Sequence, residues 1–260
     1  MTHAAAVDTG KIDIGRVIRV LMEVLKRNFA TFLLLALLLY GLPSAIVTLL
    51  RADDLRRFQD GDFSHFGPGL GLGWLVGLVT SAILQGALTY AAIEDLSGRR
   101  ASISGSLTVG LRAFLPLIGI AVLAFVGLFV GYLLLVVPGV ILTCMWMVTV
   151  PAFIAERTTI LGAFGRSAEL TRGNRWRILG ALLLWICAAF VVSLVIGFLG
   201  GVAAFITGGA GDPANPATVL TNAVTGSIGI VIGAAAAAVL YVELRKAREG
   251  GAAWMADIVR

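Results

Sequence analysis

The chain has 260 residues, of which 58% are hydrophobic and only 13% are charged, and its formal net charge is +5. Soluble globular domains carry about 25% charged residues, and the mean hydropathy here is +0.95. The composition therefore excludes an ordinary soluble domain and indicates an integral membrane protein.

Residues 1–28 are predicted to form a cytoplasmic segment with an amphipathic helix that lies in the membrane interface. Charged residues fall on one face of this helix, and the other face carries the apolar residues Ile14, Val17, Ile18, Leu21 and Leu25. The first apolar run begins only at residue 29 and continues for a full span. We therefore expect an uncleaved signal anchor here.

Long uncharged runs follow at residues 29–50, 70–93, 113–155, 178–211 and 213–242. A bilayer core of about 30 Å needs about 20 apolar helical residues, so the third run is long enough for two spans. We expect it to turn back at Val137-Pro138-Gly139, because proline ends a helix and glycine permits a reversal. The sequence thus predicts an all-α membrane protein with a six-helix membrane domain at residues 29–245, a cytoplasmic tail at 246–260, and spans at about 29–50, 70–93, 115–136, 140–155, 178–206 and 217–242.

The distribution of basic residues supports six spans. Seventeen of the twenty Lys and Arg residues lie on the side that holds both termini, and the other side has only Arg51, Arg56 and Arg57. Because cytoplasmic loops carry an excess of Lys and Arg, we expect the N-terminus and the C-terminus in the cytoplasm.

The sequence also contains an internal similarity. Aligning Asp13 with Thr159 without gaps pairs Ile14 with Ile160, Glu23 with Glu169, Lys26 with Arg172, and Asn28 with Asn174. A shorter third copy begins at Ser102. The second span of each unit ends with an aromatic residue shortly before a carboxylate: Tyr90 and Glu94, Phe153 and Glu156, Tyr241 and Glu243. We predict three units, each an amphipathic interfacial helix followed by a transmembrane hairpin.

Cationic residues cluster where the fifth span begins. Arg172, Arg175 and Arg177 are expected at headgroup level, with Trp176 at the same depth and Arg166 on the polar face of the preceding helix. Each such arginine contributes about 1 kcal/mol of attraction to anionic lipid. These five residues form a candidate lipid headgroup site. The alternative is that the arginines only fix the topology.

Small residues recur every four positions in three spans, and they predict close helix packing, within one bundle or in a homo-oligomer. These tracks are Gly69, Gly73, Gly77 and Ser81; Ser193, Gly197 and Gly201; and Thr225, Gly229, Gly233 and Ala237. We favour packing within one chain. Cys144 and Cys187 both fall in apolar stretches, where we expect them to act as small hydrophobic residues.

Residues that carry chemistry are scarce. No ionisable residue lies in the middle of a span, which disfavours proton-coupled transport, and Gln85 and Asn222 form the candidate intramembrane polar site. Asp60, Asp62 and His65 are plausible metal ligands in one outer loop, but we interpret this loop as solvated. Common hydrolase and phosphate-binding motifs are absent. We expect no catalytic residues, no cofactor, no metal and no nucleic-acid partner.

Two segments carry a family resemblance. Val137, Pro138 and Gly139, with Pro151 and Glu156 in the next span, precede an A-x-x-R-S-x-x-L-T-x-G-x-x-W pattern at Ala163, Arg166, Ser167, Leu170, Thr171, Gly173 and Trp176. This arrangement resembles the bacterial glycerophosphoryl diester phosphodiesterase membrane-domain-like family, over about residues 14–245. In some relatives such a domain precedes a soluble phosphodiesterase domain. Because this chain ends shortly after its last span, we expect that it lacks that activity.

The resemblance and the charge distribution together suggest a multi-pass protein of the bacterial cytoplasmic (inner) membrane. We expect a non-enzymatic scaffold, regulator or accessory factor in envelope or lipid homeostasis, with membrane lipids, anionic ones in particular, as partners. The alternative is a transporter or permease-like carrier for a lipid or small amphiphile. A membrane enzyme would require the Asp60, Asp62 and His65 loop to bind metal.

Overall fold

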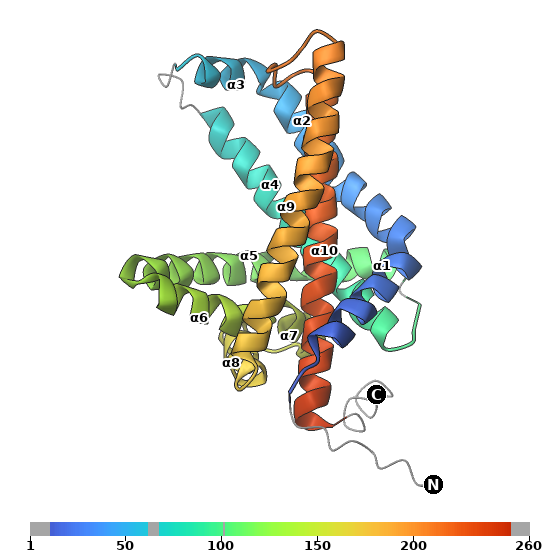
Figure 1. Cartoon of the computed structure of the whole chain (residues 1–260), viewed down its shortest axis with the longest axis vertical. Helices are drawn as coiled ribbons and strands as arrows, with labels where there is room; N and C mark the ends of the chain where they lie inside the picture. The colour runs from blue at the N-terminus through green and yellow to red at the C-terminus, as the bar shows by residue number, and fades with distance from the viewer. Residues whose placement is uncertain (1–10, 62–67, 101, 251–260) are drawn as a thin grey trace.

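The predicted six long apolar helices are present. The computed structural model describes residues 11–61, 68–100 and 102–250, and in these ranges it contains helices but no strand (Figure 1). By length and composition, six helical segments are able to cross a membrane. The helices are α1 Ile14–Ala36, η1 Leu37–Gly41, α2 Leu42–Leu50, α3 Ala52–Gln59, α4 Pro68–Leu96, α5 Ile103–Leu134, α6 Val136–Trp146, α7 Thr149–Glu156, α8 Ile160–Thr171, α9 Arg175–Ile206 and α10 Pro216–Glu249.

The N-terminal amphipathic segment and the first span form one continuous helical segment, α1–η1–α2, from Ile14 to Leu50. It begins where the Asp13 side chain accepts a hydrogen bond from the Gly15 amide at 2.9 Å, as N-capping carboxylates do. The π-helical turn η1 lies just before Pro43, which cannot donate to the carbonyl four residues earlier. α5 likewise joins the second amphipathic segment to its span, whereas α8 is a separate helix. The arrangement as three equivalent units is therefore not shown.

The helices α4 and α5 pack closely at a pair of glycines. A Cβ atom at Gly110 would overlap the Ile83 carbonyl oxygen and lie 3.2 Å from the Ala87 Cβ, and one at Gly86 would lie 3.2 Å from the Gly110 Cα. Small residues allow such close backbone contact in membranes. The α4–α5 contact thus depends on having no side chain at residue 110.

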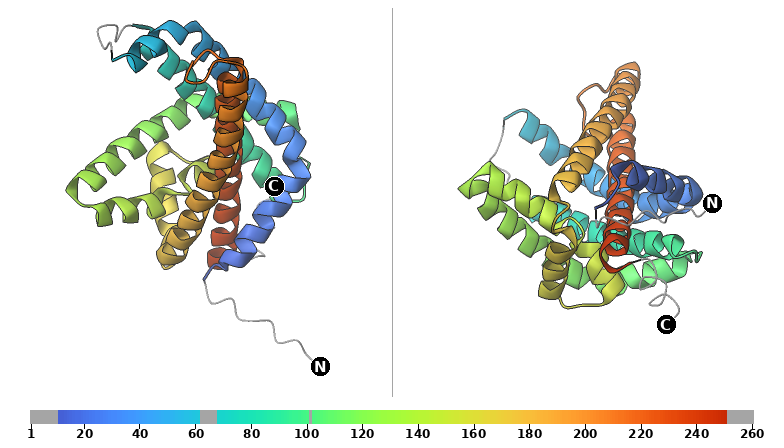
Figure 2. Two further views of the ribbon diagram at one scale, coloured as in Figure 1. Left: turned by 45° about the horizontal axis from the view of Figure 1, so that its top comes forward. Right: turned by 60° about the horizontal axis from the view of Figure 1, so that its bottom comes forward.

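The helices α5 and α6 form a hairpin that lies across the direction of α9 and α10 (Figures 1 and 2). The chain reverses at Leu135, which is extended with φ −170° and ψ 154°, and not at Val137-Pro138-Gly139 as the sequence predicted. Pro138 lies in the first turn of α6, where a missing N–H leaves no helical hydrogen bond unmade. Gly139 serves close packing instead, because a Cβ atom there would overlap the Tyr132 ring.

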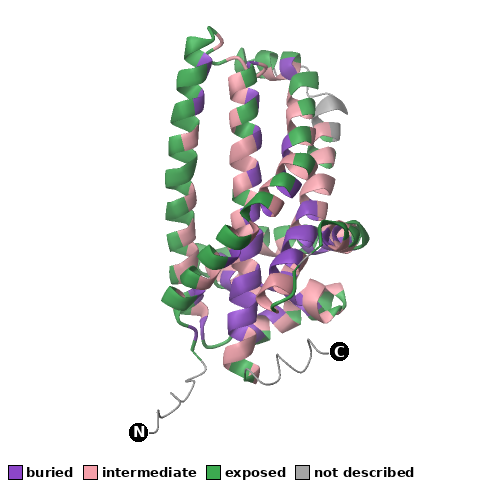
Figure 3. Cartoon of the chain, turned by 90° about the vertical axis from the view of Figure 1, so that its right-hand side faces the viewer, coloured by how far each residue is buried: buried purple, intermediate pink, exposed green. Residues whose placement is uncertain are grey.

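The helix α10 is the central helix, and it packs against α1, α4 and α9. Its buried residues include Ala234, Ala235 and Ala238, which contribute to a core with residues of α1 and α4. Burial is concentrated toward the C-terminal half of α10, whereas α9 is exposed along most of its length (Figure 3). Exposed apolar side chains cover α9, as expected of a lipid-facing helix.

The predicted tracks of small residues are mostly not the sites of close packing. Nothing lies within 4 Å of a Cβ atom built at Gly77, Gly197, Gly201 or Gly229. The close contact between α9 and α10 uses Gly200 instead, where a Cβ atom would overlap Thr221. Gly73 is the exception, because a Cβ atom there would overlap Arg51 and Val47. Spacing alone therefore does not say which face of a helix meets its neighbour.

An ion pair connects α3 to the loop between α9 and α10. The Arg56 guanidinium donates two hydrogen bonds to the Asp212 carboxylate, Nε to Oδ1 at 3.0 Å and Nη2 to Oδ2 at 3.1 Å. This contact holds the pKa of Asp212 below its ordinary value. Because both side chains are exposed, it orients α3 more than it stabilises the fold.

The α4–α5 contact yields a prediction about stability. Replacing Gly110 with Ala introduces a methyl group against the Ile83 carbonyl, so the two helices must separate. We expect the free energy of unfolding to fall by roughly 1–3 kcal/mol, measured by denaturant titration in mild detergent. Gly229→Ala is the matched control, because open space surrounds that position. Equal stability of Gly110→Ala and the parent chain would contradict this packing.

Candidate functional site at the junction of α7, α8 and α10

A break in the fourth span creates the site. Pro151 has no N–H to donate to the Met147 carbonyl, and its ring crowds that carbonyl, so the helix is interrupted between α6 and α7. Carbonyl groups near such a break need other partners. The Ser167 hydroxyl on α8 donates to the Met145 carbonyl at 2.7 Å, and the Thr149 hydroxyl donates to the Trp146 carbonyl at 2.8 Å. The break therefore fixes the position of α8.

Local capping determines where α8 begins and ends. The Thr159 hydroxyl accepts a hydrogen bond from the Gly162 amide at 3.1 Å at its start. After the helix, Gly173 adopts a φ of +86°, a left-handed conformation that favours glycine. Asn174 is buried, and its side-chain oxygen accepts from the Ile12 amide at 3.1 Å. These contacts turn the chain into α9 and attach the segment before α1 to the same place.

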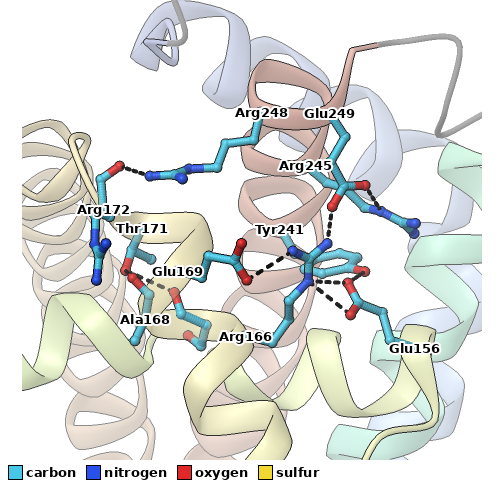
Figure 4. Close-up of polar contacts among 11 residues, drawn as sticks. Glu156, Arg166, Ala168, Glu169, Thr171, Arg172, Tyr241, Arg245, Arg248 and Glu249 are labelled. Atoms are coloured by element: carbon cyan, nitrogen blue, oxygen red, sulfur yellow. Dashed lines mark hydrogen bonds and ion pairs between the residues drawn. The ribbon is translucent and has the colours of Figure 1, made fainter.

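One arginine joins three helices (Figure 4). Arg166 on α8 donates from Nε to the Glu156 carboxylate of α7, at 2.9 Å to each oxygen, and from Nη2 to Glu249 of α10. The Tyr241 hydroxyl donates to the same Glu156 at 2.8 Å, and Arg245 donates to Glu249 at 2.7 Å. We call these five residues the junction.

The junction is partly shielded from water. The side chains of Arg166 and Glu156 are each only 20% exposed, and that of Glu249 is 26% exposed. Burial lowers the pKa of Arg166, but hydrogen bonds to Glu249 and Glu156 outweigh it and raise the pKa above the ordinary arginine value. Arg166 therefore stays charged, and its pairing is stronger than that of an exposed ion pair.

The backbone next to Glu156 is constrained. Arg157 has a φ of +49°, and no other non-glycine residue in the described ranges has a positive φ. Such a conformation is uncommon for a residue with a Cβ atom. This conformation ends α7 and turns the chain toward α8. Arg166 on α8 then donates hydrogen bonds to Glu156. The conformation is thus part of the geometry that forms the junction.

The structure separates the five predicted headgroup residues. Arg166 contacts carboxylates within the protein, and Arg177 donates to the Ile12 carbonyl. Arg175 is half-buried and contacts the Met145 sulfur at 3.7 Å. The Arg172 side chain is exposed, although its carbonyl accepts from Arg248, and Trp176 is 86% exposed. Arg172 and Trp176 are thus the two most available to lipid, and lipid contact stays a prediction for all five.

The two predicted intramembrane polar residues do not form one site. Gln85 lines a cavity of about 310 Å³ that α4, α5, α6, α7, α8 and α10 enclose. Asn222 is exposed on α10. It precedes Ile230, one of the α10 residues that line the cavity, by eight residues, which is about 12 Å along a helix.

The remaining candidates lie in an outer loop that is described only in part and in two separate helices. Asp60 is exposed, and Asp62 and His65 lie outside the described residues. Among the described residues, no group of three His, Cys, Asp or Glu side chains is placed to hold a metal ion. Cys144 is buried and Cys187 is exposed, and both are free thiols.

The sequence did not reveal the junction. From the sequence, Glu156 and Tyr241 are markers of the predicted repeat, Glu156 is also part of the family pattern, and Arg245 and Glu249 carry no predicted role. The sequence feature that points to such a junction is the charged or phenolic residue near the end of an apolar run, because such residues seek polar partners at the same depth. Pairing them required knowledge of which helices are neighbours.

The six candidate spans and their exposed apolar surfaces define a multi-pass helical membrane protein. Residues 120–242 match the profile of a family described as the membrane domain of glycerophosphoryl diester phosphodiesterase. This match confirms the predicted resemblance and includes both segments that suggested it, although it does not reach the region before residue 120. No curated protein and no solved structure matches the chain.

The junction yields a prediction about helix docking. Arg166→Met leaves Glu156 and Glu249 partly buried without their shared cation. We expect a loss of roughly 1–3 kcal/mol in the free energy of unfolding, measured by thermal or denaturant unfolding in detergent. Arg172→Gln removes an exposed charge from the same region and serves as the control.

A double-mutant cycle separates pairing from general destabilisation. Adding Glu156→Gln to Arg166→Met should cost less than the sum of the two single changes, because the second change removes a carboxylate that has already lost its cation. Strict additivity would contradict the pairing.

Proposed function

We propose that the chain is a non-enzymatic scaffold or accessory protein of the bacterial inner membrane that acts in envelope or lipid homeostasis. The observation that supports this most is the use of Arg166. In a catalytic or transport site, a charged group would border a cavity and remain available to a ligand. Here it is held by carboxylates from α7 and α10 and joins helices.

We propose further that both termini are cytoplasmic, so that the junction lies at the cytoplasmic face. The excess of basic residues on that side supports this orientation. Arg172 and Trp176 then lie at headgroup level, where an exposed cation and an indole ring favour anionic lipid. The internal repeat remains part of this proposal, with α8 as its separate interfacial helix.

The matched family is described by reference to a phosphodiesterase, and we propose that this chain supplies a membrane role without hydrolysis. Support comes from the resemblance, which covers membrane helices only. Metal-dependent hydrolysis of a glycerophosphodiester by the purified chain would contradict this proposal.

Native mass spectrometry of the protein in mild detergent tests the lipid interface. We expect anionic phospholipid to be retained in preference to zwitterionic lipid. Neutralising Arg172, Arg175 and Arg177 to Gln should weaken that retention by at least about tenfold, since each contributes about 1 kcal/mol. Arg57→Gln, on α3 at the opposite end, is the control. Retention unchanged in the triple variant would contradict the interface, and the same spectra record the subunit count.

A second candidate function is a carrier for a lipid or small amphiphile. The cavity that contains Gln85 favours it, because Phe164, Leu117 and Ile120 give this cavity an apolar wall around one amide. Binding sites for small amphiphiles combine such walls with few polar groups.

Flux into proteoliposomes tests the carrier directly. If the carrier function holds, a fluorescent phospholipid should cross in the presence of the parent chain, and Gln85→Leu should slow that flux by about tenfold. Asn222→Leu, an equal change outside the cavity, should leave it unaltered. The scaffold proposal predicts no protein-dependent flux at all.

A further inference from the structure

A second cavity lies at the opposite end of the molecule from the junction. It has a volume of about 490 Å³ and is lined by residues of η1, α2, α4 and α10. Figure 1 shows α2 and α4 descending from the α3 end of the molecule. Its wall includes the apolar residues Val47, Trp74, Leu78 and Ile230 and several hydroxyl groups.

Most hydroxyl groups of this wall already donate a hydrogen bond within the protein. Ser44 donates to the Gly41 carbonyl at 2.9 Å and Thr48 to the Ser44 carbonyl at 2.8 Å, while Thr80 donates to the Val76 carbonyl at 2.8 Å. Each of these hydroxyl groups donates its proton to a carbonyl of the same helical segment. An apolar ligand in the cavity would therefore leave none of these donors without a partner. An acyl chain therefore fits this wall.

One polar group without a hydrogen-bond partner lies beside the cavity, on the side chain of Arg51. The Nε atom of Arg51 is buried without a hydrogen-bond partner, and no ion pair joins Arg51 to a carboxylate among the described residues. The guanidinium of the nearby Arg56 differs, because it forms ion pairs with Asp53 and Asp212. A half-buried guanidinium without an anion is costly.

The absence of a side chain at Gly73 leaves room for the Arg51 side chain against α4. A Cβ atom there would overlap Nη1 of Arg51 and lie 3.1 Å from its Cδ and 2.9 Å from the Val47 Cγ1. Gly73 and Val47 both line the cavity. The arginine therefore lies across α4 at the cavity edge, and it follows α2 at the end of the uncharged run, where headgroups are expected.

We infer that this cavity binds a phospholipid, with one acyl chain against the α2–α4 wall and the phosphate paired with Arg51. The surroundings support this occupant, because the guanidinium of Arg51 lies next to Gly73 at one side of the cavity, and the lining itself is apolar or carries hydroxyl groups that mostly donate within the protein. A guanidinium is well suited to pair with a phosphate. The inference does not depend on the proposed scaffold role, which concerns the other end of the molecule.

Two pairs of matched variants test it. Arg51→Gln removes the phosphate partner, and Arg57→Gln removes an exposed charge from the adjacent helix. Gly77→Leu fills the cavity, and Gly71→Leu makes the same change at another position of α4. Both glycines have open space where a Cβ atom would stand, and only Gly77 of the two lines the cavity.

The measurement is binding of phosphatidylglycerol to the delipidated full chain by native mass spectrometry, with diacylglycerol of the same chains as the phosphate-free probe. We expect Arg51→Gln to weaken phosphatidylglycerol binding about tenfold and to leave diacylglycerol binding unchanged. Gly77→Leu should weaken both by about tenfold or more. Arg57→Gln and Gly71→Leu should bind like the parent chain.

Other results would overturn the inference. Equal losses in Arg51→Gln and Arg57→Gln would indicate a general charge effect, and parental binding by Gly77→Leu would show that the cavity is not used. Inorganic phosphate serves as the competing probe. If it displaces the lipid and raises the unfolding temperature of the lipid-free chain in an Arg51-dependent way, the site binds a free anion and not a lipid.

Discussion

The inability of Pro151 to donate a hydrogen bond determines much of the structure around α8. A helix broken within an apolar environment leaves carbonyl groups that water cannot reach, and the fold must supply partners from elsewhere. Ser167 supplies one at the Met145 carbonyl, which places α8 against the end of α6. Once α8 is there, Arg166 faces Glu156 and Glu249, and the C-terminal end of α10 is joined to the same place. The motif that carries the family resemblance is therefore largely a set of structural contacts.

Charged residues are used differently at the two ends of the molecule. At the junction, carboxylates from α7 and α10 enclose one guanidinium, and further pairs such as Arg16 with Glu243 join α1 to α10. At the α3 end, Arg56 is paired, but Arg51 lies against a glycine beside a cavity. Fixed helices at one end and a cavity of about 490 Å³ at the other are compatible with a protein that holds its position in the membrane while contacting lipid.

The arrangement of the spans is less uniform than six parallel helices. The hairpin of α5 and α6 lies across α9 and α10 (Figure 2), and its tip exposes Leu133, Leu134 and Val137. The helix α9 is held by small contacts such as Gly200 with Thr221 and is otherwise exposed. Because lipid offers an apolar surface everywhere, helices in a membrane gain little from simply hiding apolar groups. Specific contacts at glycines and polar groups therefore decide which helices meet.

The sequence by itself determined the class of protein, the number of spans and the family resemblance, because length and apolarity alone decide what is able to cross a bilayer. It also located the division of the third run to within a few residues of Leu135. Only the tertiary structure decided which side chains meet. Arg166, predicted from sequence to face lipid headgroups, contacts carboxylates 10 and 83 residues away, and Gln85 and Asn222 lie apart. Helical periodicity gives the faces of each helix but not its neighbours, and membrane helices present similar apolar faces all round. The partners of polar groups therefore follow from packing and cannot be derived from spacing.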